Sequence, residues 1–155
     1  MAEVTGEDRA TDELKQPELV FGLIGALGAE IGAVEGWVRD RVSRLGYVVP
    51  ETIKLTALLR ELRGPAFDAL KDAVSGGSIA QKMDAGNALR ALTRRGEAMA
   101  MLGVNRIRSY REEHSREGLG MKATAFIVNS LKHPIEISSL RKIYGSAFVT
   151  IAVFN

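Results

Sequence analysis

The pattern of apolar and polar residues first predicts a strand, a tight turn and a helix near the N-terminus. An apolar run from Leu19 to Ile24 ends at Gly25 and Gly28, two glycines three residues apart. Beyond them, apolar residues recur at the 3.6-residue spacing of an amphipathic helix, namely Ile31, Val34, Trp37, Val38, Val42 and Leu45. The helix is expected to end at Gly46, which suits the left-handed residue just past a helix end.

A second strand is expected within Tyr47–Thr56, interrupted at Pro50. Proline cannot donate to a ladder, so this strand should lie at an edge or bend of the sheet. Helical patterns follow over residues 57–62 and 66–74, and then from 79 to about 114 with a break near Arg95 and Gly96. Ser78 is the expected N-cap of the longest of these segments.

Two near-continuous apolar runs, residues 123–128 and 147–153, predict strands covered on both faces. Between them, Pro134 suits the first position of a helix that ends near Gly145. Strands separated by helices predict an α/β class, with a three-layer α/β/α arrangement and a mainly parallel sheet. Residues 17–155 should form one domain, in which residues 115–120 are a loop. The charged, aperiodic residues 1–16 should be a flexible tail.

The carboxyl ends of parallel strands share one rim of the sheet, so the turns after the first and third strands should meet there. Gly25–Gly28 and Ser130–His133 would then line one crevice. The exposed N–H groups of a helix start favour an anion on one side. Lys132 and His133 would face that anion from the other side.

The glycine turn departs from the phosphate-binding loop of nucleotide hydrolases. That loop requires the pattern G-x-x-x-x-G-K-[ST], in which the lysine reaches the outer phosphates and the hydroxyl binds magnesium. With Gly25 as the first glycine, Glu30 replaces the second required glycine, Ile31 the lysine and Gly32 the hydroxyl. The turn therefore keeps a glycine-rich shape without the reactive groups, and glycines that serve close packing are the alternative interpretation.

Composition excludes several kinds of chemistry. The chain of 155 residues has no cysteine, which removes disulfides, thiol nucleophiles and cysteine-ligated zinc. With two histidines, no metal site is predicted. A net charge of +2 gives no strong argument for nucleic acid. No apolar run is long enough to span a membrane and the acidic N-terminus is unlike a signal peptide, so we expect a cytoplasmic protein.

Four segments together resemble a known family. They are LVFGLIGALG (19–28), MDAGNALR (83–90), AFIVNSLKHPIEISSLRKIYG (125–145) and FVTIAVF (148–154). They resemble the N-terminal P-loop-like, nucleotide-kinase-like domain of bacterial anti-phage deoxycytidylate (dCMP/dCTP) deaminases, over roughly residues 17 to 155. In that family a zinc deaminase domain follows, with the signature H-x-E and P-C-x-x-C. This chain has no cysteine, so it cannot deaminate by that mechanism, and its end directly after a strand favours a fragment over a stand-alone domain.

The resemblance implies a P-loop NTPase-like fold and a non-catalytic or weakly catalytic nucleotide-binding regulatory domain in a deoxycytidine nucleotide deaminase system. It implies a nucleotide, ATP, GTP or a deoxynucleoside triphosphate with magnesium, as ligand, and a small inhibitory RNA and a homo-oligomer as partners. The residues expected to bind nucleotide or phosphate are Gly25, Gly28, Ala29, Asp84, Asn87, Arg90, Lys132, His133 and Arg141.

Two alternatives stay open from the sequence. In the first, the protein is an atypical nucleotide kinase or NTPase, in which Lys132, Arg90 or Arg106 supplies the missing cation. In the second, the α/β core is a scaffold for binding protein or RNA. Arg106, Arg108 and Arg111 would then form a basic strip for phosphates.

Overall fold

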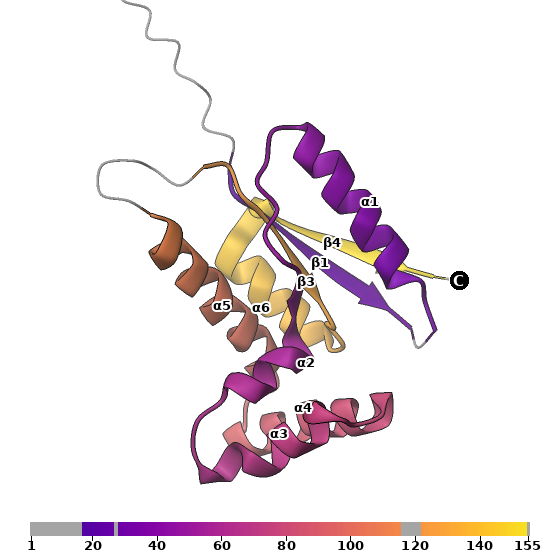
Figure 1. Cartoon of the computed structure of the whole chain (residues 1–155), viewed down its shortest axis with the longest axis vertical. Coiled ribbons are helices and arrows are strands. Elements are labelled where there is room, and N and C mark those ends of the chain that lie inside the picture. The colour runs from indigo at the N-terminus through magenta and orange to yellow at the C-terminus, as the bar shows by residue number, and fades with distance from the viewer. Residues whose placement is uncertain (1–16, 27, 116–121, 155) are drawn as a thin grey trace, which may run out of the picture.

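A four-stranded parallel sheet forms the centre of the protein (Figure 1). The computed structural model describes residues 17–26, 28–115 and 122–154, so the predicted tail and most of the predicted loop at 115–120 lie outside the described residues. The strand order is β2-β3-β1-β4. The strands are β1 (Leu19–Gly25), β2 (Ile53–Lys54), β3 (Ala125–Asn129) and β4 (Phe148–Val153).

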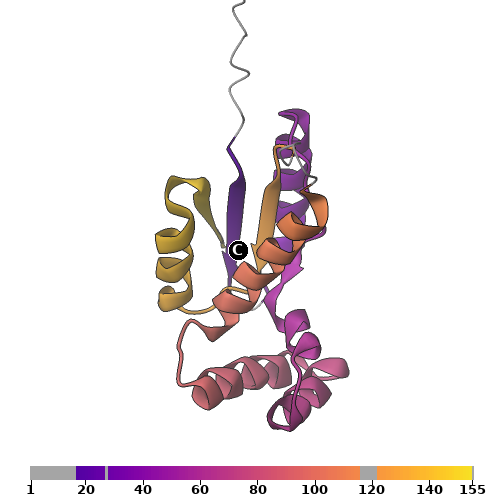
Figure 2. The same cartoon turned by 90° about the vertical axis from the view of Figure 1, so that its left-hand side faces the viewer.

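Helices cover the two faces of this sheet, which confirms the predicted three-layer α/β/α class. Side chains of successive strand residues point to opposite faces. Val20 and Phe126 pack with residues of α5 (Ala98–His114) and α6 (Pro134–Tyr144). Leu23 and Ile127 pack with residues of α1 (Ile31–Arg44) instead. Figure 2 accordingly shows α6 and α1 on opposite sides of the strands.

A helical insert between β2 and α5 lies beyond the carboxyl ends of the strands (Figure 1). It contains α2 (Leu55–Leu58), α3 (Asp68–Ser75) and α4 (Ile79–Thr93), with short 3-10 turns at Leu59–Glu61 and Pro65–Phe67. The predicted N-cap is confirmed, because the Ser78 hydroxyl accepts from the Gln81 amide at 3.3 Å and the Gln81 side chain accepts from the Ser78 amide at 2.6 Å. The predicted break is also confirmed, at Arg94, whose φ is 53°.

The second strand is shorter than predicted. Within 47–56 only Ile53 and Lys54 form a strand, while Val48 makes an isolated bridge to Thr124. Its position at the edge of the sheet agrees with the prediction. Among the described helices, none is both long and apolar enough to cross a membrane.

Arg39 of α1 binds the stretch between Val48 and β2 that does not form a strand. Its guanidinium donates to the carbonyl oxygens of Val49 and Pro50, each at 2.9 Å, and to the Thr52 hydroxyl at 2.9 Å. The Thr52 hydroxyl in turn donates to the Glu35 carboxylate. The carbonyl groups at 49 and 50 therefore bond to a helix rather than to a neighbouring strand.

A second polar cluster joins the start of β1 to α5 and α6. Arg111 makes a bidentate ion pair with Glu18, and its guanidinium lies 5.9 Å from the centre of the Tyr144 ring. The hydrogen bond to Glu18 raises the pKa of Arg111. The Tyr144 hydroxyl is buried and has no hydrogen-bond partner among the described residues. Burial raises the pKa of Tyr144 to about 12, although the Arg111 charge opposes the shift.

We predict that Tyr144→Phe changes the free energy of unfolding at neutral pH by less than about 1 kcal/mol, because the hydroxyl makes no bond that the substitution would remove. The folded-state pKa of Tyr144 lies above the ordinary value of about 10, so the unfolded chain loses this proton first as pH rises. The linked contribution to the free energy of unfolding is therefore fully present below about pH 10 and is lost as pH rises toward 12. The variant should therefore lose less stability than the wild type above about pH 10, measured by urea unfolding.

Tyr47→Phe is the matched control, since the Tyr47 hydroxyl donates to the Pro17 carbonyl at 2.9 Å. This control should lose about 0.5–1.5 kcal/mol at neutral pH. A larger loss for Tyr144→Phe than for Tyr47→Phe would show that the Tyr144 hydroxyl has a partner.

Candidate functional site

The strand order places a crevice between the loops that follow β1 and β3. These strands are neighbours, yet the chain leaves β1 for α1 on one face and leaves β3 for α6 on the other. Loops that diverge in this way open a crevice at the carboxyl ends of the strands, where ligands of α/β proteins usually bind. The Lys132 ammonium lies 3.5 Å from the Gly25 carbonyl oxygen, so the two loops meet as the sequence predicted.

The β1–α1 loop is a tightly packed turn. The Ala29 amide donates to the Ala26 carbonyl at 3.0 Å, and the Ile31 amide donates to the Ala29 carbonyl at 2.8 Å. A Cβ atom on Gly25 would lie 2.6 Å from the end of the Ile31 side chain, which packs against the core beneath α1. Gly28 has a φ of 87°, a conformation that favours glycine. Close packing therefore explains Gly25 and backbone conformation explains Gly28, and Ile31, packed against the core, fills the place of the phosphate-binding lysine.

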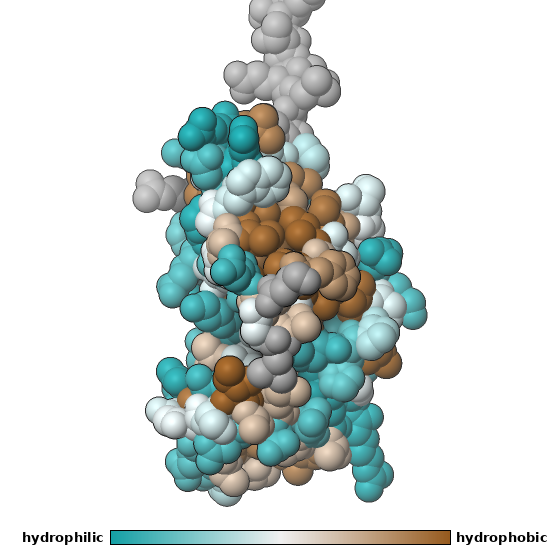
Figure 3. All heavy atoms as spheres, turned by 90° about the vertical axis from the view of Figure 1, so that its right-hand side faces the viewer, coloured by the Kyte–Doolittle hydropathy of each residue, from teal (hydrophilic) through white to brown (hydrophobic). Residues whose placement is uncertain are grey.

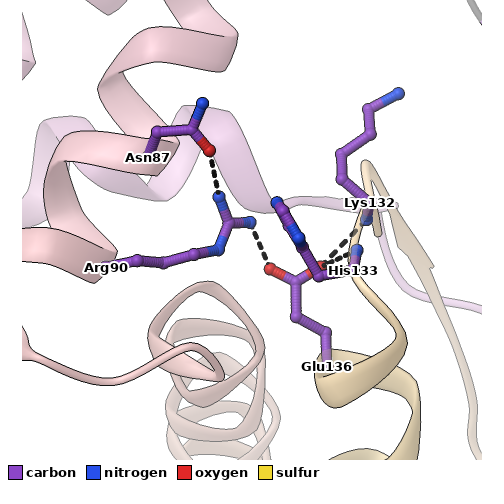
Figure 4. Close-up of polar contacts among 5 residues, drawn as sticks. All are labelled: Asn87, Arg90, Lys132, His133 and Glu136. Atoms are coloured by element: carbon purple, nitrogen blue, oxygen red, sulfur yellow. Dashed lines mark hydrogen bonds and ion pairs between the residues drawn. The ribbon is translucent and has the colours of Figure 1, made fainter.

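Glu136 fixes the loop between β3 and α6 (Figure 4). Its carboxylate is fully buried; one oxygen accepts from the amides of Lys132 and His133, at 2.9 and 3.1 Å. Pro134 begins α6, as predicted. The amides of Ala29, Ile31, Lys132 and His133 therefore already have acceptors within the protein.

Arg90 binds the other oxygen of Glu136, and it reaches this oxygen from α4 (Figure 4). Its guanidinium also donates to the Asn87 side-chain oxygen at 3.0 Å. The Arg90 side chain is only 13% exposed and that of Glu136 is 0% exposed, so the pair is shielded from water. Arg90 and Asn87, both predicted to bind phosphate, are therefore tied into a network in which a carboxylate balances the arginine charge.

A cavity of about 220 Å³ adjoins this network, between α4 and the β3–α6 loop. Ile79, Met83 and Met99 provide an apolar wall. Lys82, Lys132 and His133 provide polar groups with basic character. Ligand pockets usually measure about 300–1,000 Å³, so this cavity suits a small ligand or one part of a larger ligand.

Several predicted site residues lie apart from the cavity. Asp84 is exposed on α4 and does not line it. Arg141 lies near the end of α6 and donates to the Thr150 hydroxyl at 3.2 Å, whereas the crevice is at the start of that helix. Placing Asp84 and Arg141 in the binding set is therefore not supported by their positions. Asp84 is on the same helix as the lining residues but does not line the cavity, and Arg141 is in the last turn of α6.

The site also contains residues that the sequence analysis did not select. Lys82 faces the cavity, and Glu136 organises its edge. Ile79 and Met83, whose spacing is that of a buried helix face, are 61% and 39% exposed and line the cavity instead. The available signal was the lysine one turn after the Ser78 N-cap, beside apolar residues on a helix that follows a glycine loop.

The three arginines predicted to form a basic strip are not arranged as one. Arg111 binds Glu18, and Arg108 binds Glu112 at 3.0 Å. Arg106 lies beside a separate cavity of about 160 Å³ that also contains Glu51 and Glu61. Helical geometry places Arg106 and Arg111 roughly 140° apart around α5. Two of the three charges are thus paired with carboxylates, which does not favour a continuous basic strip.

Within the described residues, no group of three or more histidine, aspartate or glutamate side chains is placed to hold a metal ion. Comparisons with protein-family models, with curated proteins and with solved structures found no match to this chain. The class of the protein is therefore defined by its architecture: a parallel-sheet α/β domain with a small, partly basic cavity at the carboxyl ends of its central strands.

We predict that Glu136→Gln lowers the free energy of unfolding by about 3–5 kcal/mol. The amide keeps the shape of the carboxylate but leaves the buried Arg90 charge uncompensated. Arg90→Met should be similarly destabilising because it leaves the Glu136 carboxylate buried without its cation. The double variant should lose less than the sum of the two, by at least about 1 kcal/mol.

Urea unfolding of the four proteins measures this coupling, with Lys142→Ala on the exposed end of α6 as a surface control expected to change stability by about 0.5 kcal/mol or less. Additive effects of the two single substitutions would mean that the ion pair does not hold α4 to the β3–α6 loop.

Proposed function

We propose that this protein is a non-catalytic nucleotide-binding domain that holds a mononucleotide in the cavity beside α4. One observation carries the proposal: Lys82, Lys132 and His133 share a cavity with the apolar wall of Ile79 and Met83, at the carboxyl ends of neighbouring parallel strands. A nucleotide has an apolar base face and a polyanion. The wall suits the base, and the lysines suit the phosphates.

The absence of catalysis is inferred from the groups at the crevice. Phosphoryl transfer depends mainly on positioned cations that stabilise charge on the transferred phosphate. Ile31 occupies the position of the usual lysine and packs into the core. Of the cations that an atypical kinase would need, Arg90 is neutralised by Glu136, and Arg106 lies at another cavity. Lys132 is the remaining cation of that set, and a single lysine is better suited to binding a phosphate than to stabilising its transfer.

The resemblance to anti-phage deoxycytidylate deaminases suggests the role of such a domain. We propose that it is regulatory: it senses a nucleotide, supplied with magnesium as ATP, GTP or a deoxynucleoside triphosphate, in a cytoplasmic system that depletes deoxycytidine nucleotides. The zinc chemistry would belong to a deaminase domain, since this sequence has no cysteine. A small inhibitory RNA and assembly into a homo-oligomer are parts of the same proposal.

We predict that a nucleotide raises the melting temperature of the full chain. A ligand that binds only the native state adds about 2.7 kcal/mol at a hundredfold excess over its Kd. A panel of ATP, GTP, dCTP and dCMP, each with and without magnesium, measures the shift by thermal unfolding. Adenosine and deoxycytidine, which lack phosphate, should give smaller shifts because they cannot engage Lys82 and Lys132.

Alanine at both Lys82 and Lys132 should reduce the nucleotide-induced shift to less than half of the wild-type value. Lys142→Ala, which removes the same charge at the far end of α6, should keep the full shift. This comparison separates a local effect from a change in overall charge. A full shift in the double variant would place the nucleotide outside the cavity.

Incubation of the protein with ATP and magnesium should produce no diphosphate above the level of a protein-free control. Turnover that is lost on Lys132→Ala would support the kinase alternative instead. No shift with any nucleotide, together with salt-sensitive RNA binding that weakens on Arg106→Ala or Arg108→Ala, would support the RNA-binding alternative.

A further inference from the structure

β4 is an open edge of the sheet. The strand order gives it one hydrogen-bonded neighbour among the described residues, β1, so its outer N–H and C=O groups are available to another strand. Natural edge strands are usually protected by charges, proline or short length. Phe148–Phe154 contains no charged residue and no proline. The opposite edge is protected by its length, because β2 has two residues.

The face of β4 on the α1 side is also exposed. Figure 3 shows an apolar patch on this side of the molecule. Val149 lies on this face, because it pairs with Phe21 of the α1-side cluster, and it is 38% exposed. Phe154, just after the strand, is 84% exposed at the end of the same edge. Strands of parallel sheets are normally covered on both faces, so an uncovered β4 is unusual.

Trp37 of α1 borders the same area. Arg39 faces the β2 side of α1, because it bonds to residues 49, 50 and 52. Helical geometry turns Trp37 roughly 160° away from Arg39, toward β4. Its side chain is 60% exposed. We call Trp37, Val149 and Ile151 the β4 patch.

We propose that the β4 edge and the β4 patch bind a second copy of this chain, with the two β4 strands antiparallel about a two-fold axis. The two four-stranded sheets would join into one sheet of order β2-β3-β1-β4-β4-β1-β3-β2. In this arrangement both α1 helices lie on the same face, and the two patches meet between them. One contact then satisfies the open edge and covers the exposed face.

Charge favours a copy over a partner of strongly acidic or basic character. A charged strand paired with itself would bring like charges together, which destabilises the pair. β4 has no charge and avoids this cost. The neighbouring surface of α1 carries both signs, with Arg41 stacked near Trp37 and with Asp40 paired to Arg44. This surface therefore does not favour a partner that is uniformly acidic or uniformly basic.

The available area is consistent with a dimer of ordinary size. Large aromatic side chains bury 150–250 Å², so the exposed parts of Trp37 and Phe154 contribute roughly 300 Å² per copy. The strand edge and Val149 add to this area. A standard interface needs about 800 Å² per partner, so the strand edge and the facing surfaces of α1 would have to supply the rest. The dimer specifies the homo-oligomer of the proposed function and rests on it to that extent. No residue of the patch lines the nucleotide cavity, so the dimer and nucleotide binding can be tested separately.

Sedimentation equilibrium of the full chain over a concentration series tests the dimer. The mass should rise from 16.8 kDa toward twice that value and then stop. Val149→Lys should raise the dimer dissociation constant by about tenfold or more, since it places two cations in a desolvated strand pair. Leu92→Lys, on the 50% exposed site of α4, is the matched control and should leave the constant unchanged.

Single cysteines test the geometry, because the natural sequence contains none. A two-fold axis places only one residue of β4 directly opposite its own copy, with Cβ atoms about 4.5–5.5 Å apart. Among Thr150→Cys, Ile151→Cys and Ala152→Cys, one variant should therefore form a disulfide-linked dimer much faster than the others when an oxidant is added. A wild type that stays monomeric at every concentration, or equal cross-linking at all three positions, would overturn the proposal.

Discussion

The buried ion pair between Arg90 and Glu136 holds together the two segments that form the cavity beside α4. Arg90 lies on the helical insert and Glu136 on α6, 46 residues later in the chain. A buried charge is tolerated when its partner and its remaining hydrogen-bonding atoms are satisfied. Glu136 meets this condition, because one oxygen binds Arg90 and the other binds two amides of the β3–α6 loop. One carboxylate therefore sets the positions of the insert and of the loop that form the cavity.

The same network decides which groups remain for a ligand. In a phosphate-binding loop, main-chain amides surround the anion and a lysine completes the site. Here the amides of Ala29, Ile31, Lys132 and His133 bond within the protein. The Arg90 charge is balanced as well. Under the proposed function, a phosphate would be attracted by side chains at the cavity, chiefly Lys82 and Lys132, and the balanced Arg90 charge would give little support to phosphoryl transfer.

The molecule has two candidate binding surfaces, the cavity beside α4 and the open β4 edge, and their chemical character differs. The cavity beside α4 combines cations with a short apolar wall, as expected for a small charged ligand. The β4 edge is uncharged and presents main-chain groups beside exposed apolar side chains, as expected for strand pairing. A nucleotide and a second protein chain would thus be recognised at different places, one through charge and the other through hydrogen bonds and apolar contact.

The sequence by itself determined the elements and their order. Local periodicity, the Ser78 cap, the Pro134 helix start and the break near Arg95 depend on neighbours in the chain, and each is present in the fold. The edge position of the segment around Pro50 followed from the missing donor of proline. Parallel order also placed Gly25 beside Lys132.

Only the tertiary structure decided how the polar residues are used. Arg90 and Arg111 looked like free cations in the sequence, but their carboxylate partners lie 46 and 93 residues away. Ile79 and Met83 have the spacing of a buried helix face, yet both are exposed and line a cavity. Ion pairing and burial depend on which distant surfaces meet, and local spacing carries no information about that.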